Sequence, residues 1–162
     1  MEQQPLYYDT PPAPKKPMKW HNFLIYFALW LAALVMIFNA YRFFTGKIEG
    51  SAADVRYIYS LWPELKGIHT VMGILCTGAA VLALITRFAL AGFKRNAIAL
   101  LSAVYLCNAL VNPLYTLMIK LFTSVPTDGM FSASLFSGMA VPIAMIFINR
   151  DYYAKRADLF VK

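Results

Sequence analysis

Four uncharged stretches, each of 20 residues or more, dominate this sequence of 162 residues. They cover residues 22–41, 67–86, 97–119 and 130–149. A helix rises about 1.5 Å per residue, so about 20 residues cross the ~30 Å hydrocarbon layer of a membrane. The backbone in that layer must satisfy its own hydrogen bonds, and the stretches lack the two-residue alternation of barrel strands. The sequence therefore predicts an all-α, multi-pass membrane protein with an antiparallel bundle of four transmembrane helices.

The composition agrees with lipid as the solvent of this chain. Hydrophobic residues make up 60% and charged residues 14%, whereas soluble domains contain roughly 45–50% and about 25%. The net charge of +7 comes from basic residues near the ends of the uncharged stretches, as in membrane proteins, and no basic helix suits a nucleic acid. We therefore expect the lipid bilayer, and no nucleic acid, as a partner.

The distribution of lysine and arginine predicts the orientation in the membrane. Residues 1–19 contain three, the second connection contains three, and residues 150–162 contain four, whereas the other side has five. Because basic residues favour the cytoplasmic side, both termini should be cytoplasmic in a cell membrane. The organisation we expect is a flexible proline-rich cytoplasmic tail over 1–19, a transmembrane domain over 20–150, and a short basic cytoplasmic tail over 151–162.

The first external connection, residues 45–66, has the signals of a short helix. Ser51 can cap its start, with Asp54 in the first turn. Such a helix would present Tyr57, Tyr59 and Trp62, which suit the headgroup layer of a membrane. We expect an interfacial helix here, with a partner-binding surface as the alternative.

The third stretch has the one polar stripe within the predicted spans. At 100° per residue the members share one side of a helix: Ser102, Tyr105, Asn108, Asn112, Tyr115 and Thr116. The stripe predicts either a small polar pocket or hydrogen bonds between helices, and we favour the second. His69 is the one titratable candidate in the second stretch, either as a proton-relay or ligand residue or as an interfacial hydrogen-bonding histidine, which we favour.

No catalytic pattern stands out in the sequence. Nucleophile–base pairs, glycine-rich phosphate loops, paired carboxylates and metal-ligand clusters are missing, so we expect no enzyme activity, no metal and no cofactor. Cys76 and Cys107 lie inside uncharged stretches, without the spacing of a redox or metal pair. We interpret both as small helix-packing residues.

Three segments together resemble a group of small uncharacterised bacterial four-helix integral membrane proteins. They are residues 19–26 (KWHNFLIY), 86–94 (TRFALAGFK) and 152–161 (YYAKRADLFV). The resemblance covers most of the chain after the proline-rich segment. It implies a bacterial cytoplasmic membrane and the same four-helix topology, and it supplies no activity or site residues.

The functional hypothesis is a non-enzymatic accessory or scaffold subunit that acts through protein or lipid contacts. It rests on abundant helix-packing features and on the absence of charged residues from the middle of the spans. The rival is a small oligomeric transporter or channel subunit, with a pathway along the stripe that His69 or a second copy completes. The expected partners are accordingly a membrane protein or another copy of the chain.

Overall fold

The computed structural model describes residues 17–126 and 133–160, with side chains described for 17–126 and 138–160. The described residues are helical and contain no strand. The first helix is continuous but has three parts, α1 (Lys19–Phe23), the π-turn η1 (Leu24–Ala28) and α2 (Leu29–Phe44). The remaining elements are α3 (Ala52–Leu61), α4 (Glu64–Ala91), α5 (Ala97–Phe122), α6 (Ala133–Ala154) and the 3-10 turn η2 (Ala157–Leu159).

Among the described residues, three helices are long and apolar enough to cross a membrane, which indicates a membrane protein. They are Lys19–Phe44, Glu64–Ala91 and Ala97–Phe122. Each contains one of the predicted spans and continues beyond its uncharged stretch, because a helix need not stop where the first charged side chain reaches the interface. The fourth predicted span corresponds to α6, and its residues 130–132 lie outside the described part.

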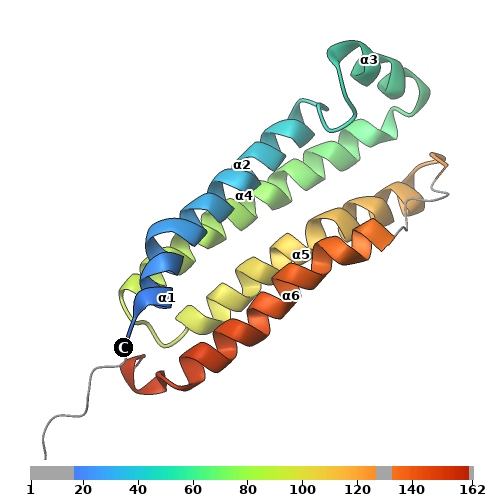
Figure 1. The fold of residues 1–162 in the computed structure, drawn as a ribbon. Coiled ribbons are helices and arrows are strands. Elements are labelled where there is room, and N and C mark those ends of the chain that lie inside the picture. Colours follow the sequence, from blue (N-terminus) through green and yellow to red (C-terminus); the bar gives the residue numbers. More distant parts are fainter. Residues whose placement is uncertain (1–16, 127–132, 161–162) are drawn as a thin grey trace, which may run out of the picture.

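The long helices lie roughly side by side (Figure 1). The α1–α2 helix runs along α4, and α5 runs along both α4 and α6. The described ends of the chain lie together at one end of the bundle, where Arg156 Nη2 donates to the Pro17 carbonyl oxygen at 3.2 Å. We call this the terminal end. The short helix α3 lies at the opposite end, which we call the α3 end (Figure 1).

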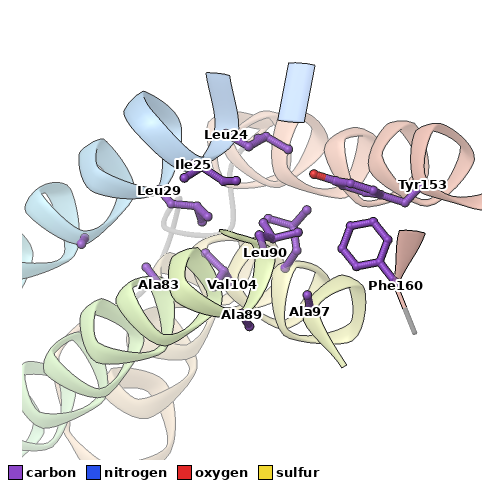
Figure 2. Close-up of a cluster of buried hydrophobic side chains, with 12 residues drawn as sticks. Leu24, Ile25, Leu29, Ala83, Ala89, Leu90, Ala97, Val104, Tyr153 and Phe160 are labelled. Atoms are coloured by element: carbon purple, nitrogen blue, oxygen red, sulfur yellow. The ribbon is translucent and has the colours of Figure 1, made fainter. Parts of the chain in front are cut away.

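A core of buried side chains holds the terminal end together. Every long helix contributes to it, including Leu24 from the first helix, Leu90 from α4 and Leu101 from α5. Tyr153 and Phe160 close it from the C-terminal side and point toward the other members (Figure 2). Because lipid is as apolar as these side chains, close van der Waals packing is what favours this association in a membrane.

A second core lies at the α3 end, mainly between α2 and α4. Met36, Met72 and Cys76 are almost fully buried there, and Ile119 joins them from α5. On the same helix pair, a Cβ atom placed on Gly73 would lie only 2.7 Å from the Phe44 ring. Small residues thus let the first helix and α4 approach closely.

Candidate functional site

A buried histidine with three polar neighbours forms the candidate site at the α3 end. His69, on α4, has an exposed fraction of only 1%. Its Nδ1 lies 2.7 Å from the Tyr59 hydroxyl oxygen, and its Nε2 lies 2.8 Å from the Tyr115 hydroxyl oxygen and 3.2 Å from Glu49 Oε1. The Tyr115 hydroxyl also donates to Glu49 Oε1. We call these four residues the His69 cluster.

One assignment of protons satisfies every contact of the His69 cluster. With a neutral imidazole protonated on Nε2, the Tyr59 hydroxyl donates to Nδ1, and Nε2–H donates toward Glu49 and the Tyr115 oxygen. The Glu49 carboxylate then accepts from both His69 and Tyr115. The cluster in this form has a net charge of −1, which belongs to Glu49.

The surroundings favour the ionised form of Glu49, which lies in the connection between α2 and α3. The hydrogen bond from His69 is the largest cause that lowers the pKa of this carboxyl below its ordinary value, and the bond from Tyr115 adds to it, against the opposing effect of burial. Burial raises the pKa of the Tyr59 hydroxyl, and the nearby charge of Glu49 raises it further. Tyr59 therefore stays a hydrogen-bond donor while Glu49 stays negative.

Local backbone chemistry brings Tyr59 to the histidine. The predicted short helix is confirmed as α3, with the Ser51 hydroxyl accepting from the Asp54 N–H and the Asp54 carboxylate accepting from the Ser51 N–H at 2.8 Å. Gly46 has a φ of +70° just before this helix. A Cβ atom there would lie 2.7 Å from the Tyr59 hydroxyl oxygen and from Val55 Cγ1, so glycine is what allows the connection to fold back.

A cavity of about 320 Å³ adjoins the His69 cluster. Glu49, Tyr115 and Thr116 supply its polar lining. The rest of the lining is apolar or aromatic: Ile48, Ile58, Trp62, Leu65, Ile119 and Val125. Its volume falls at the lower end of the range of about 300–1,000 Å³ that small-molecule sites occupy.

The residues of the predicted polar stripe do not share one surface in the structure. Tyr115 and Thr116 line the cavity at the α3 end, and Tyr115 contacts the predicted candidate His69. Tyr105 and Asn108 line a separate hollow of about 160 Å³ between the first helix, α5 and α6. Asn112, between the two places, is exposed. The stripe is thus divided between two hollows and one exposed position.

Three of the six polar side chains of the stripe bond to their own helix. Ser102 Oγ, Asn108 Nδ2 and Thr116 Oγ1 each donate to the carbonyl oxygen four residues earlier, at 2.9 to 3.0 Å. Such bonds satisfy a hydroxyl or amide locally without a partner helix. These three side chains therefore do not make the bonds between helices that we favoured from the sequence.

Sequence reasoning missed Glu49, which gives the site its charge. A lone glutamate in a connection resembles any solvated surface residue, and only the fold-back at Gly46 brings it to His69. The sequence predicts Tyr59 at the membrane interface, and no sequence pattern indicates its bond to His69.

A second histidine cluster lies at the terminal end. His21 Nδ1 lies 2.9 Å from the Tyr153 hydroxyl oxygen, and the His21 ring stacks on Phe93 with 4.9 Å between centroids. Phe93 has a φ of 51°, a conformation that costs a non-glycine residue about 1–2 kcal/mol. Trp20 Nε1 donates to Asn149 Oδ1 at 2.9 Å, so α6 is bonded to the start of the first helix twice. This arrangement fastens the two ends of the chain together.

The His69 cluster is the more suitable of the two for binding, because it adjoins a cavity and has a charged group. Within the described part of the chain, no three or more His, Cys, Asp or Glu side chains are placed to hold a metal ion. An ionised carboxylate beside an apolar cavity is suited to a positively charged or hydrogen-bond-donating group.

Comparison with family models, with curated proteins and with solved structures finds no match to this chain.

Proposed function

We propose that the chain is a four-helix, multi-pass protein of a bacterial cell membrane, with α6 as the fourth span. The 22 residues of α6 give a length of about 33 Å at 1.5 Å per residue, close to the thickness of the hydrocarbon layer. It lies beside α5 (Figure 1), whose length and apolar character suit a span. The bacterial setting rests on the resemblance of the three sequence segments.

The terminal end faces the cytoplasm in this proposal. Two observations support the assignment. Ten of the 15 lysine and arginine residues belong to segments at or leading to this end, and such an excess favours the cytoplasmic side. The described parts near both termini lie together there, which supports the same compartment for both.

The orientation predicts opposite labelling of two introduced cysteines. In a background without Cys76 and Cys107, Arg56→Cys on α3 should react with a membrane-impermeant maleimide in intact cells, because α3 would face outward. Lys162→Cys should react only after the cells are permeabilised. The reverse pattern would show that the orientation is wrong.

The chain acts, in our proposal, as a non-enzymatic accessory subunit that contacts another transmembrane helix through α5. The observation that supports this is the exposed side chain of Asn112. It makes no side-chain hydrogen bond to another described residue, and it lies within the third span. An amide that faces lipid without a partner is unfavourable, whereas asparagine commonly bonds across helix interfaces in membranes.

Replacing Asn112 with leucine should weaken association with the partner about threefold. The reason is that a hydrogen bond between transmembrane helices contributes about 0.6 kcal/mol on average, which corresponds to that factor. The measurement is crosslinking in native membranes, gentle purification and mass-spectrometric quantification of the recovered partner, whether another protein or a second copy.

Asn108→Leu is the matched control, because the Asn108 amide already donates to the Val104 carbonyl within α5. Its partner recovery should stay at the wild-type level. Equal recovery for Asn112→Leu and the wild type, with the same folded fraction, would contradict an interface at α5. Loss of a measured transport activity in the Asn112 variant would instead favour the transporter hypothesis.

A further inference from the structure

The cavity beside the His69 cluster combines one negative charge with apolar walls. Glu49 Oε1 accepts from both His69 and Tyr115, while its Oε2 accepts no hydrogen bond from a described residue. Its side chain is 24% exposed, so the carboxylate is held in place and still accessible. The site therefore has a fixed, unused acceptor that carries negative charge.

Further acceptors lie around the same space. The Thr116 hydroxyl lines the cavity and donates its proton to the Asn112 carbonyl at 3.0 Å, which leaves its oxygen lone pairs available. The Tyr115 hydroxyl also lines the cavity and has already donated its proton to Glu49. A ligand group with several N–H donors fits these partners better than a group that only accepts.

No basic side chain of the described residues neutralises Glu49, so its carboxylate can pair with a cationic ligand. In the part of the chain that the structure describes, no lysine or arginine lies within ion-pair distance of Glu49, and the one residue that does is His69, which is neutral in the proton assignment above. The described lining of the cavity likewise contains no lysine or arginine. An anionic ligand would meet the Glu49 charge without a compensating group, which disfavours it.

The walls suit an apolar body attached to that cation. Ile58, Leu65 and Ile119 offer aliphatic surface, and Trp62 offers an aromatic ring at the same cavity. The volume of about 320 Å³ restricts the ligand to a small molecule or to the head of a larger one.

We propose that this cavity binds a primary ammonium ion with an apolar body, its nitrogen on Glu49 and its body against Trp62, Leu65 and Ile119. The site goes beyond the accessory function and does not depend on it. A free organic amine and the ethanolamine head of a membrane lipid share this chemistry.

The test is the binding of 2-phenylethylamine to the full-length protein in phosphatidylcholine nanodiscs, measured by titration calorimetry. We expect saturable binding to the wild type and at least tenfold weaker binding to Glu49→Gln. Glutamine keeps an oxygen that can accept from His69 and Tyr115 but removes the charge. This variant should therefore stay folded, with a melting temperature lowered only by the loss of the charge from these bonds. Glu64→Gln, which removes an exposed carboxylate at the start of α4, should bind like the wild type.

Two analogues and one lipid complete the design. The neutral 2-phenylethanol and the quaternary trimethyl analogue should each bind at least tenfold more weakly than the amine, because one lacks the charge and the other lacks N–H donors. If phosphatidylethanolamine in the nanodisc competes with the amine, the natural ligand is the head of the lipid. If it does not compete, the natural ligand is a free amine. Absence of saturable amine binding, or equal binding of the amine to wild type and Glu49→Gln, would overturn the proposal.

Discussion

Replacing His69 with alanine should lower the free energy of unfolding by about 3 kcal/mol. The imidazole is 1% exposed and contacts Tyr59, Tyr115 and Glu49. Its removal leaves the Tyr59 hydroxyl without its acceptor, while Tyr115 and Glu49 each lose one contact but stay bonded to each other. A buried polar group without a partner costs about 1–3 kcal/mol, and the lost side chain also leaves a cavity. The measurement is reversible unfolding of the purified protein in mixed micelles.

Thr70→Ala is the control for this substitution. Thr70 is the next residue on α4, is exposed, and donates its hydroxyl proton to the Lys66 carbonyl of its own helix. Its replacement should change the unfolding free energy by less than about 0.5 kcal/mol, as for surface positions in general. Similar losses for the two variants would mean that the His69 cluster does not stabilise the α3 end.

Replacing Gly46 with alanine should also destabilise the protein by about 3 kcal/mol. Its φ of +70° would cost an alanine about 1–2 kcal/mol. The new Cβ atom would lie 2.7 Å from Val55 Cγ1 and from the Tyr59 hydroxyl oxygen, and overpacking of this kind typically costs about 1–3 kcal/mol. The same unfolding measurement tests this value.

Gly78→Ala is the matched control for Gly46→Ala. Gly78 lies within α4, and apart from its chain neighbours and the nearby backbone of its own helix no heavy atom of the described residues lies within 4 Å of the place where its Cβ would be. Alanine is favoured over glycine in a helix by about 1 kcal/mol, so this variant should be as stable as the wild type or more so. A Gly46→Ala protein of wild-type stability would show that the fold-back of the connection does not depend on glycine.

The helical class of the fold could be predicted from the sequence because the signals are local. An uncharged stretch of 20 residues has few structural options in lipid, and the Ser51–Asp54 pair caps α3 as its spacing predicted. The ends of the helices were predicted less accurately. The uncharged stretch ends at residue 86, whereas α4 continues through Arg87 to Ala91. Charged side chains there reach the interface or an aromatic ring, as Arg87 does over Trp30 at 5.1 Å.

The candidate site could be predicted only in part, because it depends on contacts between distant segments. His69 stood out as a titratable group in an apolar stretch, and the favoured hydrogen-bonding role matches its three polar contacts. We expected the polar side chains of the α5 stripe to bond to other helices, and Tyr115 does so with His69. Ser102, Asn108 and Thr116 instead bond to their own backbone.

The backbone conformation of Phe93, at the terminal end, could not be predicted from the sequence. Phe93 takes a backbone conformation that a sequence pattern assigns to glycine. Hydrogen bonds from the Phe93 N–H to the Leu90 carbonyl and from the Lys94 N–H to the Ala89 carbonyl end α4 in this way. The stacking of Phe93 on His21 offsets the cost, and only the assembled bundle supplies that stacking.

The two histidine clusters differ in how much of the chain each requires, which has a consequence for biosynthesis. His69 meets Tyr59 and Glu49 across 10 and 20 positions, and Tyr115 across 46. His21 meets Tyr153 only across 132 positions. A chain emerging from the ribosome can therefore close the α3 end once three helices have been inserted. The contacts at the terminal end cannot form until α6 has been synthesised. The nascent protein should therefore pass through an intermediate in which the contacts at the α3 end are formed and those at the terminal end are not.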